Sequence, residues 1–267
     1  MTRKFLAFIL AGTLISGFFI TSCDDDTGSD INIFTIEDDR QLGRDLHEQI
    51  KEDEQFDLMD REEYEEAYQH LDRIGETLLN SGELKRKEEF DWNFYLIDND
   101  TTLNAFAAPG GYLYFYTGLI DFLDTEHQFA GVFGHEIAHA DLRHSTQRMT
   151  RAYGVQTLLD IVLGEDRSQL ADVAADLALL SYNRDQESEA DEYSVIYLNP
   201  TEYDARGAAG FFEKMNQHGG ASPPEFLSTH PDPENRVDEI HNKWEELGSQ
   251  EGEEFEERYQ EFKDALP

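Results

Sequence analysis

The amino-acid sequence predicts an α+β fold that is mostly helical and contains one small β-sheet. Apolar residues recur at helical spacing over residues 37–80 and again from residue 124 to the C-terminus. Between Phe90 and Phe122 the pattern changes to alternation and to aromatic runs, which are typical of strands. We therefore expect a single domain in which helices surround a short sheet.

Two helices are predicted before the sheet. In residues 37–52, Leu42, Leu46 and Ile50 are four positions apart, so they share one helix face. A second helix is expected over about 61–80, where "NSG" supplies an end signal. Its apolar stripe consists of Tyr64, Tyr68, Leu71, Ile74 and Leu78.

Two or three strands are expected next. "FDWNFYLID" alternates, "NDTTLNAFAAPGG" carries turn residues, and "YLYFYTG" is an extended aromatic run. A helical pattern then dominates the remainder of the chain. The predicted helices lie near residues 125–151, 153–163, 167–182, 184–198, 204–217, 233–247 and 252–265.

The N-terminus has the features of a secretory signal. Arg3 and Lys4 precede an apolar core that is too short to be read as a membrane-spanning helix. The letters "ITSC" at its end resemble a bacterial lipobox, which implies that Cys23 is lipidated and becomes the mature N-terminus. An uncleaved signal anchor with an incidental thiol is the alternative.

The predicted lipidation divides the chain into a lipoprotein signal peptide over 1–22, an acidic tether over 23–36 and one domain over 37–267. We expect a protein anchored by lipid to a bacterial membrane and exposed to an extracytoplasmic compartment. Cys23 is the only cysteine, so the domain must depend on its core and on any bound metal instead of disulfides.

The charge balance excludes one class of partner. The chain has 58 acidic and 21 basic residues and a formal net charge of -37, so nucleic-acid binding is not expected. Acidic runs such as "EGEEFEER" are most simply interpreted as a solvated surface.

The stretch "FGHEIAHADLRHST" contains the strongest chemical signal. His135 and His139 are four apart and share a helix face, so both imidazoles can bind one ion. Glu136 stands beside them, within reach of a water at that ion, which is the position of a general base. The neighbouring residues are mostly apolar, so the helix should be buried, and a metal would satisfy its polar groups.

Other interpretations of this stretch stay open. The two imidazoles could be satisfied core histidines without a metal. His144 could supply a further ligand, although such a position more often belongs to a residue that bonds the backbone at a helix end. The metzincin spacing is excluded because Ser145 stands six residues after the second histidine of the motif.

A second acidic pair lies downstream in "SYNRDQESEADEYSVIYL". Glu187 and Asp191 are four apart and share a helix face, whereas Glu189 points elsewhere. Spacing alone would equally fit a solvated face, but the apolar flanks favour burial. If Glu187 is the third metal ligand, Asp191 is placed to accept the N–H of a ligand histidine.

Three motifs in this order resemble one known family. "GHEIAHADLRH", "NRDQESEAD" and the upstream "NAFAAPGGYLYFYTGLI" are similar to the signature set of the zinc metallopeptidases that include the CAAX prenyl endopeptidases, HtpX and the BepA/LoiP-type envelope proteases. The similarity extends from about Glu37 to Ile240. It implies a zincin-like (gluzincin) metallopeptidase domain, and the soluble lipoprotein branch fits best.

The resemblance also implies a role for each matching residue. One zinc ion per chain would be bound by His135, His139 and Glu187, with Glu136 as general base and Asp191 as the supporting carboxylate. The implied activity is endopeptidase cleavage of unfolded or misassembled envelope proteins in quality control. A zinc-bearing chaperone or binding module that does not cleave is the alternative. A lipoprotein without metal is disfavoured because it leaves Glu136 without a role.

Two loops complete the predicted site. In "NAFAAPGGYLYFYTG" we expect a strand edge that binds an extended peptide, although a plain turn is the alternative. In "LSTHPDPENRVDEI" we expect His230 near the open position of the zinc and Arg236 bracing the site, although His230 could merely cap the following helix. The predicted substrate contacts are Asn104, Ala105, Phe106, Gly110 and Gly111.

Overall fold

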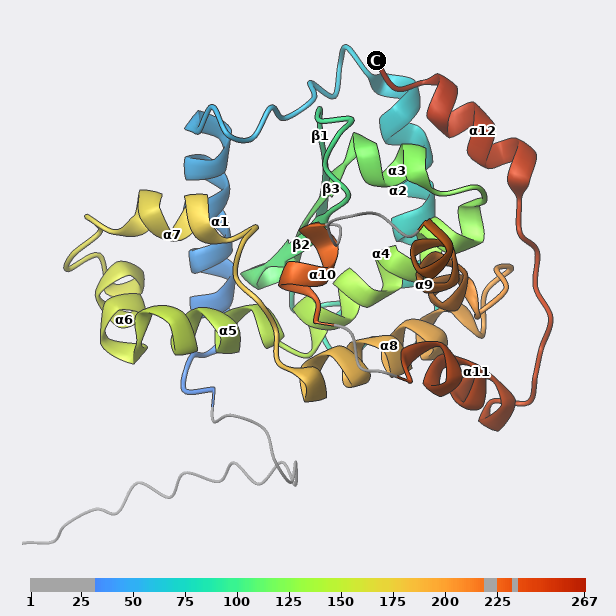
Figure 1. The fold of residues 1–267 in the computed structure, drawn as a ribbon. Coiled ribbons are helices and arrows are strands. Elements are labelled where there is room, and N and C mark those ends of the chain that lie inside the picture. Colours follow the sequence, from blue (N-terminus) through green and yellow to red (C-terminus); the bar gives the residue numbers. More distant parts are fainter. Residues whose placement is uncertain (1–31, 219–224, 232–234) are drawn as a thin grey trace, which may run out of the picture. The chain divides into compact units, whose positions relative to one another are not determined.

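The computed structural model describes residues 32–218, 225–231 and 235–267 (Figure 1). The predicted signal peptide, Cys23 and most of the predicted tether lie outside the described residues. Among the residues described, no helix is both long enough and apolar enough to cross a membrane.

The predicted sheet is present among the helices (Figure 1). Within the described ranges it has three strands, in the spatial order β1-β3-β2. β1 (Asn93–Ile97) runs parallel to β3 (Tyr112–Tyr116). β2 (Ala105–Ala108) runs antiparallel to β3, to which the short 3-10 helix η1 (Pro109–Gly111) connects it. β2 therefore forms one edge of the sheet.

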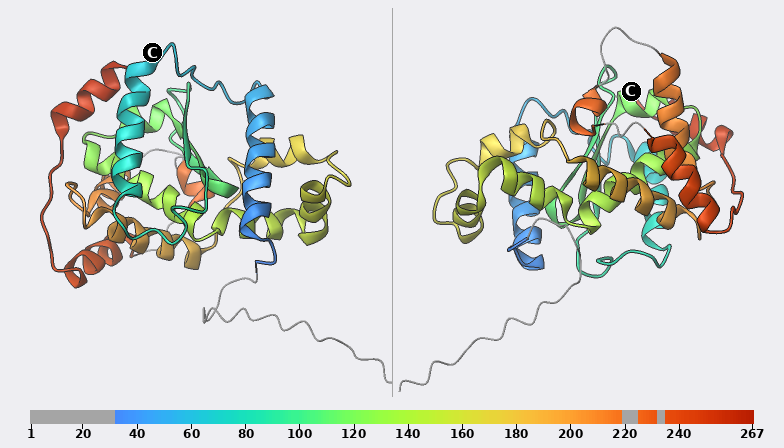
Figure 2. Two further views of the ribbon diagram at one scale, coloured as in Figure 1. Left: turned by 180° about the vertical axis from the view of Figure 1, so that it is seen from behind. Right: turned by 60° about the horizontal axis from the view of Figure 1, so that its bottom comes forward.

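One face of the sheet is covered by α1 (Ile36–Glu52), which lies beside it in the view from behind (Figure 2). The contact is aromatic. His47 of α1 stacks on Tyr95 with 4.3 Å between ring centroids, and its Nδ1 is 2.9 Å from the hydroxyl of Tyr114. Phe106 of β2 stacks on the same Tyr114 at 4.6 Å, so the three strands and α1 share one cluster.

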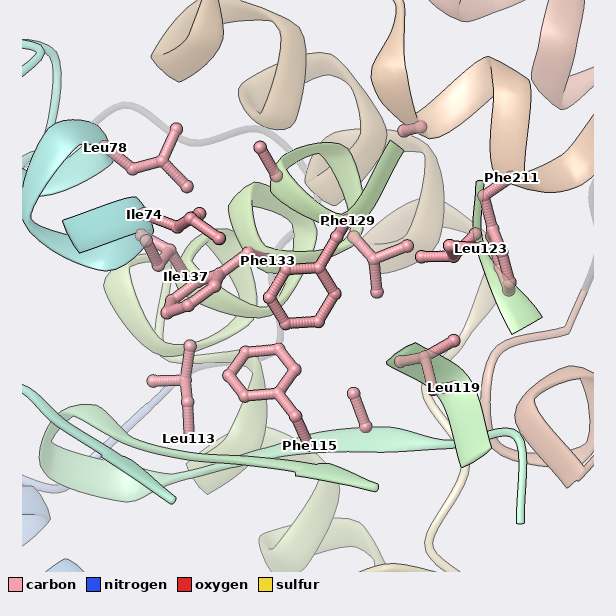
Figure 3. Packing of buried hydrophobic residues seen from close by; sticks show 14 of the residues in the cluster. Ile74, Leu78, Leu113, Phe115, Leu119, Leu123, Phe129, Phe133, Ile137 and Phe211 are labelled. Carbon is pink, nitrogen blue, oxygen red and sulfur yellow. The ribbon is translucent and has the colours of Figure 1, made fainter. Parts of the chain in front are cut away.

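The other face packs against α4 (Glu126–Asp141), the central helix of the fold (Figure 3). Phe115 of β3 meets Phe133 at 4.4 Å and Phe129 at 5.3 Å, and all three side chains are fully buried. Truncating one such ring to alanine costs about 3–5 kcal/mol. α2 (Glu65–Leu79) adds Ile74 and Leu78 to this cluster.

α4 approaches its helical neighbours closely because it has glycines at the contacts. A Cβ added at Gly131 would lie 2.1 Å from the backbone nitrogen of Ala208. A Cβ at Gly134 would lie 2.9 Å from Leu198 of α8 (Arg184–Leu198). The hydroxyl of Ser194 donates to the carbonyl of Gly131 at 2.8 Å and fixes the contact. α8 is thereby held against α4 along its length.

The remaining helices surround these layers (Figures 1 and 2). Within the described ranges they are α3 (Thr117–Phe122), α5 (His144–Tyr153), α6 (Val155–Leu163), α7 (Leu170–Asp176), α9 (Gly207–His218), α10 (Glu225–Thr229), α11 (Arg236–Glu246) and α12 (Glu256–Asp264).

Three sequence predictions about the helices were wrong. The helix predicted over 125–151 is two helices, because Arg143 adopts a left-handed conformation (φ 65°) between α4 and α5. The helix predicted over 167–182 is shorter, because α7 ends at Asp176. The segment to Phe122, expected to be extended, turns into α3, where Gly118 lets the chain pass close to the Asp100 carbonyl. α10 was not predicted.

Candidate metal centre

α4 brings the two motif histidines together in the buried interior. His135 is 2% exposed and His139 is fully buried. Their Nε2 atoms are 2.9 Å apart, and the rings are nearly perpendicular at 87°. Residues four apart on a helix lie one above the other, which explains this convergence.

α8 supplies the carboxylate. Asn183 and Gln186 form a capping box that starts the helix, and Glu187 follows in the first turn. The Glu187 carboxylate is fully buried, with one oxygen 3.5 Å from His135 Nε2 and the other 3.3 Å from His139 Nε2. The predicted third ligand therefore faces both imidazoles.

A fourth side chain completes the cluster. His230, which follows α10, is fully buried and stacks on Phe226 at 4.2 Å. Its Nδ1 is 3.3 Å from His135 Nε2 and 3.1 Å from a Glu187 oxygen. The potential ligand atoms of these three residues and His139 all lie within 4.8 Å of one another.

The spacing of these donor atoms fits a small cation. Zinc lies about 2.0–2.2 Å from histidine nitrogens and carboxylate oxygens, so donors at tetrahedral corners are about 3.3 Å apart. The separations around His135, His139 and Glu187 are 2.9, 3.3 and 3.5 Å. Several lone pairs directed at one point repel one another unless a positive charge lies between them. The donor set of imidazoles and one carboxylate is the type that zinc prefers.

The electrostatics of the cluster favour a cation at the same point. Burial lowers the pKa of His139 well below its usual range, and His135 adds to this, so the imidazole is in the neutral form that binds metals. Burial alone would raise the pKa of Glu187, but His230 and Arg236 reverse the effect and lower that pKa strongly. Burial opposes protonation of His135, yet hydrogen bonds with Asp191 and Glu187 raise its pKa to about 9.

Asp191 and Arg236 support the cluster from behind. One oxygen of Asp191 is 2.8 Å from His135 Nδ1, as expected for a carboxylate that accepts the N–H of a ligand histidine. Arg236, at the start of α11, donates to both Asp191 oxygens at 2.5 and 2.8 Å and to Glu187 at 2.9 Å. The guanidinium therefore fixes two carboxylates at once.

Glu136 differs from every other charged group of the cluster. Its side chain is fully buried, and neither carboxylate oxygen has a hydrogen-bond partner among the described residues. His230 Nε2, which is also without such a partner, lies 3.5 Å from one of these oxygens. Because buried polar atoms are nearly always hydrogen-bonded, an acceptor in this state has lone pairs that are open to a bound molecule.

The predicted substrate residues are only partly near the centre. Asn104 is buried, and its amide oxygen accepts from the hydroxyl of Thr229, beside His230, at 3.4 Å. On the β2 edge the carbonyl of Ala107 accepts from Ser145 at 2.8 Å and from Arg148 at 3.0 Å, so α5 already occupies part of this edge.

The other predicted contacts have packing roles. Phe106 points to the α1 face of the sheet, where it stacks on Tyr114. Gly110 and Gly111 have positive φ angles of 76° and 93°. A Cβ at Gly110 would lie 2.9 Å from α1, and one at Gly111 would lie 3.3 Å from Trp92. Close packing therefore explains both glycines without a substrate.

Two neighbours of His139 were not predicted as such: Tyr182 was not singled out, and His144 was considered only as a possible further ligand. Tyr182 stacks on the His139 ring with 3.5 Å between centroids and an angle of 5°. Because a helix was predicted to residue 182, the sequence contained no indication of this contact. His144 places its Nδ1 3.0 Å from the Nδ1 of His139. The sequence shows His144 as a further histidine shortly after the motif. It does not show the break at Arg143, which turns this side chain inward.

Two histidines of one helix and a glutamate of a second helix define a centre of the zinc-metallopeptidase class. The family comparison agrees, because the description "Peptidase family M48" matches residues 65–243. The chain therefore belongs to peptidase family M48, and zinc is the metal of these metalloproteases.

Several relatives share this region. A beta-barrel assembly-enhancing protease of Escherichia coli is 30% identical over 66% of this chain and 38% of its own length. The metalloprotease YcaL of the same species is 30% identical over 56% of this chain and 61% of its own length. The mitochondrial metalloendopeptidase OMA1 of Arabidopsis thaliana is 32% identical over 54% of this chain and 30% of its own length. The chain thus spans less than two thirds of these relatives.

Proposed function

We propose that this chain is a zinc-dependent endopeptidase that cleaves unfolded or misassembled proteins of the bacterial cell envelope, in protein quality control. The names of the relatives, a beta-barrel assembly-enhancing protease among them, support this substrate class. The lipobox-like letters before Cys23 support lipid anchoring on an extracytoplasmic face.

The observation that carries the proposal is the state of Glu136. The carboxylate is fully buried, lies on the helix of His135 and His139, and has no hydrogen-bond partner among the described residues. A purely structural metal site would leave this acceptor without a function. A hydrolase requires such a group to accept the proton of the attacking water.

Each residue of the cluster then has a defined task. His135, His139 and Glu187 would hold zinc, which when bound acidifies water and polarises a carbonyl group. Glu136 takes the proton from the attacking water and passes it to the leaving amine. Asp191 keeps the His135 Nδ1 proton in place, so that Nε2 remains free to bind.

His230 and Arg236 act around these groups. We assign His230 to the inner wall of the site, because it lies 3.5 Å from Glu136 and 3.1 Å from Glu187. Arg236 fixes Asp191 and Glu187 and offsets their negative charge in the interior.

The test is digestion of casein by the purified protein and by its Glu136→Gln variant, with the zinc content of both measured. Glutamine preserves the shape of the side chain but cannot accept the proton. We expect cleavage by the wild type, loss of cleavage in the variant, and one zinc ion in each. Equal cleavage by both proteins would disprove the role of Glu136.

The competing function is a zinc-bearing chaperone that holds envelope proteins without cleaving them. It predicts that neither protein digests casein, although both contain zinc and both prevent aggregation of an unfolded protein. Glu136, which accepts no hydrogen bond from the described residues, favours the peptidase, because holding a client requires no general base.

We place the substrate along the main chain of the β2 edge at Asn104, Ala105 and Phe106, whereas the Phe106 ring stays packed on Tyr114. An extended peptide can bond to the outward main-chain groups of an edge strand. Because Ser145 and Arg148 occupy the Ala107 carbonyl, the peptide has to bond beside them or displace them. A photo-reactive peptide bound to the Glu136→Gln variant should label residues 104–106. Labelling confined to distant elements such as α12 would contradict this placement.

A further inference from the structure

The two metal-binding imidazoles of α4 are supported in different ways. His135 Nδ1 faces a carboxylate oxygen of Asp191 at 2.8 Å. His139 Nδ1 faces a second imidazole, the Nδ1 of His144, at 3.0 Å. His144 Nε2 in turn lies 3.2 Å from an oxygen of Glu189. A row of three groups thus extends from His139 towards the surface, where the Glu189 side chain is 38% exposed.

The chemistry of this row allows one consistent assignment of protons. If His139 directs the lone pair of its Nε2 at the metal, its proton must be on Nδ1. That N–H needs an acceptor, so His144 Nδ1 must carry a lone pair. The proton of a neutral His144 is then on Nε2, where Glu189 accepts it. The carboxylate at the surface therefore selects the tautomers of both histidines.

The row exists only because α4 ends where it does. In an uninterrupted helix, positions five apart point about 140° away from each other, so His144 would face away from His139. Arg143 breaks the helix with its φ of 65°. Its guanidinium bonds to Asp39 of α1 at 2.6 Å, which stabilises the break. His144 then turns inward and is only 3% exposed.

We propose that His144 and Glu189 are positioning residues, which hold His139 in the tautomer and orientation that bind zinc. Neither residue contacts the reacting atoms. The role rests on the metal site of the proposed function, but not on peptidase activity. Removing such outer partners of a metal ligand typically weakens metal binding about 10–100-fold.

Two amide substitutions at position 144 distinguish this hydrogen-bonding role from a role in packing alone. Asparagine in His144→Asn places its amide where Nδ1 stands, so it can still accept from His139. Glutamine in His144→Gln places its amide where Nε2 stands, so it reaches Glu189 but not His139. We expect zinc affinity near that of the wild type for His144→Asn, and affinity about tenfold weaker for His144→Gln and His144→Ala.

Glu189 provides a second test on a partly exposed residue, where folding is not at risk. Glu189→Ala should weaken zinc binding, whereas Glu189→Gln, which keeps an acceptor oxygen for His144, should weaken it less. Glu192→Ala is the matched control, because it removes an acidic residue from the same helix without contact to the histidines. It should leave zinc affinity unchanged.

Zinc affinity is measured by chelator competition, together with the visible spectrum of the Co²⁺-substituted protein and the thermal stability of the metal-free protein. Unchanged zinc affinity in His144→Ala and Glu189→Ala would overturn the proposal. This holds even if the metal-free variants are less stable than the metal-free wild type. Tighter binding by His144→Gln than by His144→Asn would overturn it as well. A wild type that binds no zinc would instead disprove the metal site, and the positioning role with it.

Discussion

Two buried glutamates of α4 have opposite surroundings. Glu126, at the start of the helix, accepts from Arg73 at 2.6 and 2.8 Å, from Arg258 at 2.5 and 3.0 Å, and from the Tyr203 hydroxyl at 2.6 Å. Glu136, ten residues later, accepts nothing from the described residues. Both side chains are fully buried. A buried carboxylate with every lone pair used holds elements together, whereas one with its lone pairs unused is available for chemistry.

The difference assigns the two ends of α4 to different tasks. Glu126 connects α4 to Arg73 of α2 and to Arg258 of α12, helices that are far apart in the sequence. Glu136 accepts no hydrogen bond from the described residues and lies within the metal cluster, with one oxygen 3.5 Å from His230 Nε2. Substitutions at the first position should therefore change folding, and those at the second should change only the reaction.

The largest effect is expected for Glu136→Gln. Loss of a general base lowers the rate about 10²–10⁴-fold. The free energy of unfolding should change by less than about 1 kcal/mol, because no hydrogen bond among described residues is lost. Casein digestion and urea unfolding measure the two quantities. A strongly destabilised variant would show that Glu136, like Glu126, stabilises the fold.

Glu126→Ala should lower the stability of the fold and leave the activity per folded molecule unchanged. Two arginines lose their carboxylate, and breaking a buried ion pair costs about 3–5 kcal/mol. We expect about 3 kcal/mol in the free energy of unfolding, because the side chains of Arg73 and Arg258 are 33% and 26% exposed. Urea unfolding measures the loss. Zinc content and activity per folded molecule should be retained, and loss of zinc at full stability would contradict the assignment.

His230→Ala tests the surroundings of Glu136, because His230 lies beside Glu136 and Glu187. A nitrogen that faces the metal position is removed, so we expect zinc affinity to fall about tenfold. Chelator competition measures this change. Unchanged zinc affinity together with unchanged activity would remove His230 from the site and leave it as a helix-capping residue.

The smallest effect is expected for the dependence of stability on acid pH. Burial alone would raise the pKa of Glu126, but hydrogen bonds from Arg73, Arg258 and Tyr203 lower it below its ordinary value of 4.5. A lowered pKa in the folded state contributes stability that is complete above the unfolded value and is lost as the pH falls through the folded pKa. Glu126→Gln should therefore show a shallower loss of stability below about pH 4.5 than the wild type. Parallel curves would contradict this.

The sequence predicted what depends on spacing within a helix. The pairs at positions 135 and 139 and at 187 and 191 converge because residues four apart share a face, and apolar flanks correctly indicated that both pairs are buried. The resemblance to a family added His230 and Arg236, which lie in the cluster. Their catalytic roles stay predictions, as do the substrate strand and the lipidation of Cys23.

What the sequence did not predict depends on contacts between distant residues. The break at Arg143 is stabilised by Asp39, which is 104 positions away, and no local pattern encodes that bond. The same break turns His144 towards His139. Tyr182 reaches the His139 ring because α7 ends at Asp176 and the residues from there to the start of α8 are not helical.

The close contact at Gly134 has a consequence for the choice of ion. Because this glycine lets α8 lie directly against α4, the histidine and carboxylate donors are held 3.3 to 3.5 Å apart. Calcium needs six to eight oxygen ligands at about 2.3–2.6 Å, and this narrow frame supplies mostly nitrogen at a shorter radius. The helix packing itself thus selects against the larger ion, even where calcium is abundant.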